Sequence, residues 1–449
     1  MEIPRGKPWS PQTPPPDLTF IHAHVVDVET SSVIRDATVR VREGRIVSVT
    51  PHGTTASLAP GSQLVDLAQR HYLCPGLIDC HVHLTATPGG VSLRELFAAS
   101  PNALAYRTAY VAREMLLRGF TTVRDTGGAD AALREAIADG LLPGPRLFIA
   151  GHALSQTGGH GDFRASYQGE AFKCCGGQHA SLARVCDGVP ACLAAVRDEL
   201  RQGADFIKIM CGGGVATPTD ALDMLQFTPE EIRAITTTAA YSGKYVTAHA
   251  YTVEAIRHAV DNGVRGIEHG NFIDRETAEY CQARGVVFTP TLVTYHGMTQ
   301  PAFAGFLDEF SQRKNQEVLR GGLRALTVLR DAGALICYGS DLLAGMHPLQ
   351  NQEFSIRAAA LSAGEILQSA TVNAARSLGM AGQLGSLREG SIADLLILNA
   401  NPLEDIGVLD RIQQSLVGLL KAGRVVTVQA DGVDGLSVDP IYDPCRARG

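Results

Sequence analysis

Two different spacings of apolar positions divide the chain into distinct parts. Near the N-terminus, short apolar runs at 19–26, 37–42 and 45–50 are separated by tight polar turns, which is typical of antiparallel strands. The same texture returns at 394–398 and 416–427. We therefore predict a small β-sandwich domain formed from both termini.

The middle of the chain repeats another unit, in which a short apolar run precedes a stretch with helical periodicity. Eight β–α units in series favour an α/β fold with a closed TIM (β/α)8 barrel, and an open doubly wound sheet is the alternative. The strands are expected at 73–84, 121–125, 146–150, 206–210, 245–250, 266–269, 286–290 and 335–340, and the helices at 103–118, 190–202, 229–242, 253–262, 274–284, 315–331 and 363–378.

These elements define the expected domains. Residues 1–72 and 381–430 supply the two parts of the β-sandwich domain, residues 73–380 form the (β/α)8 barrel, and residues 431–449 form a C-terminal tail. The length of 449 residues suits a barrel of about 250 residues with such additions. An apolar content of 45% is enough for a large buried core.

Charge and hydropathy narrow the classes of partner. A formal charge of −7 gives no electrostatic reason to bind nucleic acid or an anionic membrane. No apolar run approaches the roughly 18 residues that span a bilayer. The Pro-rich segment 1–17 lacks the apolar stretch of a secretory signal, so we expect a cytoplasmic protein.

Four cysteines are clustered within residues 174–192, namely Cys174, Cys175, Cys186 and Cys192. In a cytoplasmic protein we expect them to be reduced thiols, with a disulfide or a structural zinc site as the alternative.

Metal-ligand side chains stand at the ends of the predicted barrel strands. The first strand ends in Asp79-Cys80-His81-Val82-His83. Residues two apart on a strand point to the same side, so His81 and His83 can face the barrel mouth and share one metal. Lys208 lies inside an apolar strand, where an ammonium ion is costly to bury. Its head is therefore solvated at the strand end, paired or chemically altered.

Three further strands end in residues of the same kind. His249, His269 and Asp341 end the fifth, sixth and eighth strands. Active sites of TIM barrels lie at the C-terminal ends of the strands, so these side chains are expected to converge on one mouth. The predicted metal ligands are His81, His83, Lys208, His249, His269 and Asp341.

With these residues the chain resembles the amidohydrolase superfamily over nearly its whole length. The matching segments are 75–83, Lys208, His249, His269, 339–341 and 390–395. The resemblance implies two divalent metal ions, bridged by a carbamate formed from CO₂ on Lys208. It also implies that His81, His83 and Asp341 bind the more buried ion, and that His249 and His269 bind the more exposed one. Zn²⁺ fits these nitrogen and oxygen ligands best.

The chemistry of such a centre is consistent with amide hydrolysis. A carbamate makes the lysine a negative ligand, and metal binding lowers the pKa of a bridging water towards neutrality. The resulting hydroxide is the expected nucleophile. Asp341 would orient the water, take its proton and pass it to the leaving amine.

A segment after the third strand concerns the substrate. Residues 153–162 look like a segment shared by ochratoxinase-like enzymes and C-terminal dipeptidases, including Xaa-Pro dipeptidases. The resemblance implies cleavage of an amide next to a C-terminal amino acid, with dipeptides, N-acyl amino acids and ochratoxin A as candidates. His160 in this segment would polarise the carbonyl or hold the substrate, and a solvent-facing loop histidine is the alternative.

Other residues near strand ends are candidate substrate contacts. Tyr251 lies two positions after His249, so it should face the barrel mouth. The resemblance to dipeptidases, in which a tyrosine at this position contacts the substrate, favours dipeptides, although simple packing is an alternative. Gly213 would let the backbone approach a ligand, unless it only serves a turn. His296 follows the seventh strand. Arg124 and Asp125 are expected to form a structural ion pair beneath the site.

Two other functions remain open. One is a cyclic amide or lactone hydrolase of the imidazolonepropionase type, although Lys208 argues against a site with a single metal. The other is a non-catalytic barrel scaffold, because fold alone does not fix function. A scaffold has no physical need for six converging metal-type side chains. The expected partner is a small amide or dipeptide, and the resemblance implies a homo-oligomer.

Overall fold

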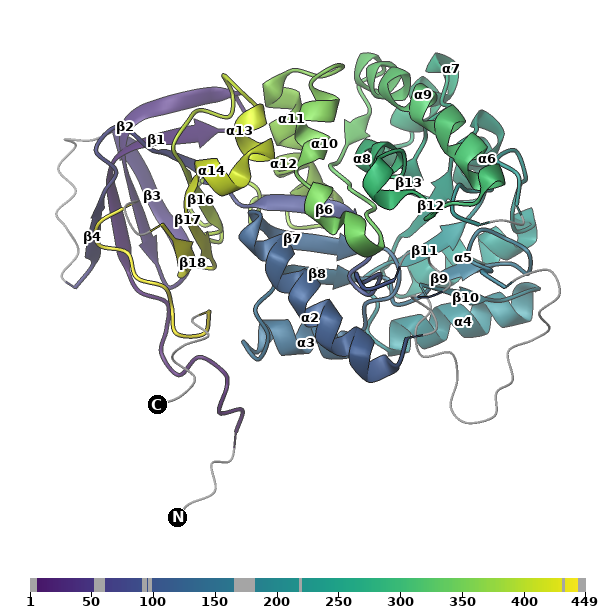
Figure 1. Cartoon of the computed structure of the whole chain (residues 1–449), viewed down its shortest axis with the longest axis horizontal. Coiled ribbons are helices and arrows are strands. Elements are labelled where there is room, and N and C mark those ends of the chain that lie inside the picture. Colours follow the sequence, from purple (N-terminus) through teal and green to yellow (C-terminus); the bar gives the residue numbers. More distant parts are fainter. Residues whose placement is uncertain are drawn as a thin grey trace.

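The computed structural model describes residues 6–51, 61–90, 95, 99–164, 182–217, 220–429 and 433–442. Within these ranges, a β-sheet domain packs beside a barrel surrounded by helices (Figure 1). Both ends of the chain contribute to the β-sheet domain. The predicted TIM barrel with a small β domain from both termini is confirmed.

The β domain is one continuous sheet of eight strands that branches at β1, because β1 pairs with β2 on one side and with both β4 and β5 on the other. β5 and β16 pair antiparallel and so join the two ends of the chain. Alternate side chains of the strands, including Phe20, Val39 and Leu395, pack into a separate apolar core. The strands are β1 (Leu18–Asp27), β2 (Ser32–Arg42), β3 (Arg45–Pro51), β4 (Gln63–Asp66), β5 (Tyr72–Pro75), β16 (Leu395–Leu398), β17 (Leu416–Lys421) and β18 (Arg424–Val428).

The junction between the two domains lies at Gly76. The apolar run at 73–84 was predicted as one strand, but the structure divides it into β5 in the terminal sheet and β6 (Leu77–Val82) in the barrel. A Cβ atom at Gly76 would lie 2.2 Å from Oγ1 of Thr121. Glycine therefore lets the backbone pass close to the second barrel strand as it changes sheets.

Eight parallel strands form the barrel. Backbone pairing runs in order through β6 to β8 and again from β11 to β15. The amide of Asp205 donates to the carbonyl of Ile149 at 2.7 Å between the two groups, and the amide of Asp341 donates to the carbonyl of His81 at 2.8 Å where the barrel closes. The remaining barrel strands are β7 (Phe120–Asp125), β8 (Arg146–Ile149), β11 (Ile207–Met210), β12 (Val246–Ala250), β13 (Gly266–His269), β14 (Val287–Thr289) and β15 (Leu335–Ile336).

Helices cover the outside of the barrel at the predicted places, with local differences. The long helix α9 begins at Glu309, before the predicted 315, because the Asp308 side chain caps the amide of Ser311. The predicted helix at 363–378 is divided into two by the turn at 370–371. The helices are α2 (Pro101–Leu117), α3 (Ala131–Ala138), α4 (Val189–Arg201), α5 (Pro229–Tyr241), α6 (Val253–Asp261), α7 (Arg275–Gln282), α8 (Leu292–Gly297), α9 (Glu309–Asp331), α10 (Gln352–Arg357), α11 (Ala363–Ser369), α12 (Val372–Ser377), α13 (Gly407–Asp410) and α14 (Ile412–Ser415).

Two short strands, β9 (Ala153–Ser155) and β10 (Ala183–Val185), extend the sheet beside β11. Of the clustered cysteines, Cys174 and Cys175 lie outside the described residues. Cys186 and Cys192 are buried thiols with their sulfur atoms 3.9 Å apart. None of the helices in the described ranges is both long and apolar enough to cross a bilayer.

Candidate metal centre and substrate cavity

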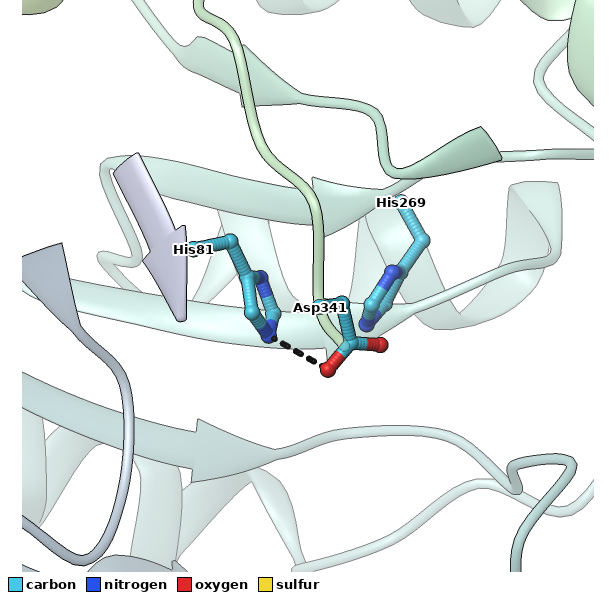
Figure 2. A group of neighbouring side chains, drawn as sticks. All are labelled: His81, His269 and Asp341. Carbon is cyan, nitrogen blue, oxygen red and sulfur yellow. Dashed lines mark ion pairs between the residues drawn. The ribbon is translucent and has the colours of Figure 1, made fainter. Parts of the chain in front are cut away.

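Three strand ends bring metal-type side chains to one point at the barrel mouth. His81 lies near the end of β6, His269 ends β13 and Asp341 lies after β15. Ligand-type atoms of these three residues lie within 4.8 Å of one another (Figure 2). Nε2 of His81 and Nε2 of His83 each lie 3.3 Å from Oδ1 of Asp341. Both histidines of the first strand therefore face the mouth.

The distal nitrogens of His81 and His83 are oriented by fixed acceptors. Nδ1 of His81 lies 2.8 Å from Oε2 of Glu268, and Nδ1 of His83 lies 2.8 Å from the carbonyl oxygen of Gly127. A carboxylate and a carbonyl can only accept, so each Nδ1 carries a proton, and Nε2 is the ring nitrogen that faces Asp341. This donor set fits a divalent metal ion.

Neighbouring charges and hydrogen bonds keep the carboxylates of this centre ionised, against the effect of burial. Burial alone would raise the pKa of Glu268, but the Arg124 guanidinium, 2.7 Å away, and the hydrogen bond with His81 bring that pKa below its usual range. Burial likewise opposes ionisation of Asp341, whose pKa is held well below its usual range by His81 and His83. Asp341 is therefore available as an anionic ligand and as a proton acceptor.

The expected ion pair between Arg124 and Asp125 is wrong. Arg124 reaches across the barrel to Glu268, whereas Asp125 accepts hydrogen bonds from the backbone amides of Leu84, Gly127 and Ala129. Neighbouring residues on a strand point to opposite sides of the sheet, which separates the two charges.

His249 and His269 form a second pair next to the first. Their ring centroids lie 4.7 Å apart, and Nδ1 of His269 lies 2.7 Å from Oγ1 of Thr291. Desolvation lowers the pKa of both histidines well below the usual value, so both are neutral and able to bind a metal. His269 and Asp341 have φ values of 74° and 52°. Such backbone conformations are rare for residues other than glycine and cluster at functional sites.

Lys208 is buried inside the barrel. It lies on β11 opposite Thr247 and two positions before Met210, a residue of the cavity wall. Burial lowers the pKa of Lys208 to about 8, against the opposing charges of Glu268 and Asp341. About a tenth of this amine is therefore neutral at pH 7, far more than for an exposed lysine, and only the neutral amine reacts with CO₂.

A cavity lies above these groups. Its polar side chains are His83, His160, His249, Tyr251, His269, Tyr295 and Asp341. Its apolar walls include Phe163, Leu182, Met210, Val215, Met298 and Leu343. The cavity therefore places a metal-type donor set at the bottom of a mostly apolar pocket, which is typical of small-molecule sites.

The structure places His160 and Tyr251 at this cavity. The His160 ring stacks on that of His249 with centroids 4.3 Å apart, and the Tyr251 ring meets His249 edge-on at 4.6 Å. The hydroxyl of Tyr295 donates to the hydroxyl of Tyr251 at 3.0 Å and lies 3.1 Å from Nδ1 of His269. Tyr295 is therefore a cavity residue that sequence reasoning missed.

Two other candidates lie differently. Gly213 is not part of the cavity wall, but its carbonyl oxygen lies 3.1 Å from Nε2 of His249, and a Cβ atom there would lie 1.8 Å from the carbonyl oxygen of Ala221. The structure does not bring His296 to the cavity, because its side chain is exposed on α8. One position along a helix turns the side chain by about 100°, so Tyr295 faces inwards instead.

Comparisons with known proteins agree with this geometry. Residues 72–433 match the sequence model of the family described as the amidohydrolase family. The chain is 30% identical to ochratoxinase from Aspergillus niger over 420 residues, which cover 91% of this chain and 86% of that relative. A solved structure of a prolidase complexed with N-methylphosphonate-L-proline is 40% identical, with a TM-score of 0.88, and the match covers 92% of this chain and 100% of that one. A Xaa-Pro dipeptidase with bound methionine is 28% identical, with a TM-score of 0.81 and coverage of 91% and 99%.

Proposed function

The chain belongs to the amidohydrolase family and is a hydrolytic enzyme, and from that premise we propose that it cleaves an amide bond next to a C-terminal amino acid. Dipeptides and N-acyl amino acids are the proposed substrates, with ochratoxin A as a further candidate. The observation that carries this proposal is the convergence of histidine and aspartate donors on one cavity with an adjacent buried lysine.

The donor set supports a centre for two divalent ions. In this proposal His81, His83 and Asp341 would hold one ion and His249 and His269 the other, and Lys208, carboxylated by CO₂, would supply a further anionic ligand. When bound, such ions, for which Zn²⁺ is the best fit, supply Lewis acidity and a nucleophilic hydroxide near neutral pH. The acceptors on Nδ1 of His81 and His83 keep their Nε2 atoms ready for binding.

The side chains around the centre have separate tasks in this proposal. Asp341 is ionised, so it accepts the proton of the nucleophile and returns it to the leaving amine. His160 holds the substrate at the scissile carbonyl from the cavity wall. Tyr251, fixed by the hydrogen bond from Tyr295, contacts the substrate beside it.

The apolar walls of the cavity favour a substrate with apolar side chains. Met210 and Phe163 cluster with Ala153 and Ala183, while Leu343 lies two positions after Asp341. Burying apolar side chains of the substrate against such walls stabilises the complex by roughly 25 cal/mol per Å². The names of the relatives, ochratoxinase, prolidase and Xaa-Pro dipeptidase, also support an amide that ends in an amino acid.

Metal content and a hydrolysis screen test this proposal together. Purified protein is assayed by elemental analysis and offered ochratoxin A, N-acyl amino acids and Xaa-Pro dipeptides. Lys208→Ala is compared with Lys244→Ala, a change on the loop before β12. We expect about two metal equivalents per chain and cleavage of a carboxylate-bearing amide, both lost in Lys208→Ala alone. A single metal with turnover of cyclic amides only would contradict the proposal, as would a metal-free, inactive protein.

A further inference from the structure

We propose that Thr217, Asp220 and Lys314 form a positioning network that fixes the ring of His160 at the cavity. The inference rests on the proposed role of His160 in holding the substrate. None of the three network residues lines the cavity, so each would act through His160 rather than on the substrate.

Thr217 fixes the orientation of the imidazole ring. Its Oγ1 lies 2.7 Å from the carbonyl oxygen of His160 and 2.8 Å from Nδ1 of the same residue. A hydroxyl has one proton, and a carbonyl can only accept it, so Oγ1 in turn accepts from Nδ1–H. This pair of hydrogen bonds commits Nδ1 to Thr217 and leaves Nε2 as the ring nitrogen available to the cavity.

Asp220 ties the same ring to the loop after β11. Its fully buried carboxylate places Oδ2 3.4 Å from Nδ1 of His160 and accepts from the backbone amide of Gly214 at 2.9 Å. Gln226 lies between the two, since its amide nitrogen lies 3.3 Å from Oδ2 and its Oε1 accepts from the backbone amide of His160 at 2.8 Å. The side chain and the backbone of His160 are thus held by the same loop.

Lys314 anchors that loop to helix α9. Its buried ammonium donates to the carbonyl oxygens of Gly214, Thr217 and Asp220 at 2.5, 2.7 and 3.0 Å. These three bonds use all three protons of the ammonium. Nζ also lies 3.6 Å from Oδ1 of Asp220, so the two buried charges offset each other.

Gly214 transmits the position of the loop to the ring. A Cβ atom at Gly214 would lie 1.9 Å from Cε1 of His160, so the ring packs directly against loop backbone. There is no side chain between them to absorb a displacement. A shift of the loop would therefore move His160, and misplacing a substrate-holding group by about 1 Å can lower activity about 100-fold.

A double-mutant cycle tests whether the network acts through His160. Thr217→Val is made in the wild-type chain and in His160→Ala, and kcat/KM is measured with the amide that is cleaved best in the screen above. Thr217→Ser restores the hydroxyl. Thr238→Val is the matched control, because Thr238 is a buried threonine of α5 that donates to a backbone carbonyl away from the cavity.

We expect Thr217→Val to lower kcat/KM about 10-fold in the wild-type chain and less than about 2-fold in His160→Ala. Thr217→Ser and Thr238→Val should stay within about 2-fold of the wild type. An equal loss in both backgrounds would overturn the network while leaving the proposed function intact. Unchanged activity of His160→Ala would instead refute the role of His160 on which the network depends.

A second variant covers the case in which Thr217→Val does not fold. Asp220→Asn combined with Lys314→Met removes both buried charges together, so neither is left uncompensated. Thermal unfolding and metal content confirm that the protein is intact. We expect this double variant to lower kcat/KM in the wild-type chain but hardly at all in His160→Ala. Equal losses in the two backgrounds would overturn the network.

Discussion

The two sides of the cavity are held in place by different means. On one side, His81 and His269 lie in barrel strands and Asp341 follows one, and backbone pairing sets the positions of these strands. On the other, His160 lies in a loop after β9 and is held by side chains from another loop, including Thr217. The first side fixes the distances between donor atoms, while the second depends on a hydrogen-bond network.

Substitutions on the two sides should therefore have different effects. A substitution on the strand side should change metal binding or proton transfer, because those side chains form the proposed donor set. Substitutions on the loop side should change how the substrate is held and leave the proposed metal binding unchanged. Since loops accept change more readily than barrel strands, the loop side is also where specificity can vary among relatives.

Asp341→Asn should break the strand side most severely. Asparagine has the same size and tolerates the φ of 52° at this position, but it cannot accept a proton. We expect kcat to fall about 10³- to 10⁴-fold, measured by steady-state hydrolysis, while metal content is followed by elemental analysis. Asp331→Asn at the exposed end of α9 is the control. Activity of Asp341→Asn within tenfold of the wild type would refute its role as the proton acceptor.

Glu268→Gln should weaken the same side through the histidine it orients. The change removes the charge opposite Arg124 and perturbs the acceptor of Nδ1 of His81. We expect metal affinity to fall about 10- to 100-fold in a chelator titration. The free energy of unfolding should fall by about 3–5 kcal/mol, because a buried guanidinium is left unpaired.

The matched change Glu276→Gln separates this effect from ordinary loss of charge. Glu276 pairs with Arg257 at 2.8 Å, but its side chain is 85% exposed. Exposed pairs contribute about 0–1 kcal/mol, so stability and metal affinity should hardly change. Equal effects of the two substitutions would show that Glu268 has no special part in orienting His81.

The elements that the sequence predicted well are those whose apolar pattern is complete within a short segment of the chain. The eight barrel strands were recognised because each is a short apolar run between helical stretches. The division at Gly76 was missed because it depends on β5 pairing with β16, more than three hundred residues away along the chain. The early start of α9 depends on one capping side chain, Asp308.

The site shows the same limit. The side-chain period of two brought His81 and His83 to one face, as the spacing predicted. Partners of buried charges could not be predicted, because Arg124 meets Glu268 from 144 residues away and Lys314 meets Gly214 from 100 residues away. The choice between Tyr295 and His296 depended on the helical phase of a short segment after β14.

Gly214→Ala should disturb the loop side alone. The added methyl group would overlap the His160 ring, so the ring or the loop must move. We expect kcat/KM to fall about 10-fold with metal content unchanged. Gly6→Ala is the control, since a Cβ atom there meets nothing within 4 Å. Loss of metal in Gly214→Ala would contradict the separation of the two sides.

Tyr295→Phe should give the smallest effect, because Tyr295 is neither a proposed metal ligand nor part of the network around His160. Its hydroxyl contacts Tyr251 and His269, and the change removes both hydrogen bonds while keeping the ring. The hydrogen bond to Tyr251 is the one that bears on the substrate, and its net loss of about 0.5–1.5 kcal/mol corresponds to a change of about 2- to 10-fold in kcat/KM. Tyr241→Phe, on an 88% exposed side chain of α5, should leave activity unchanged. If Tyr295 mainly orients Tyr251, KM should rise while kcat stays nearly constant. A fall in metal content would instead show that Tyr295 acts mainly on His269, a proposed metal ligand.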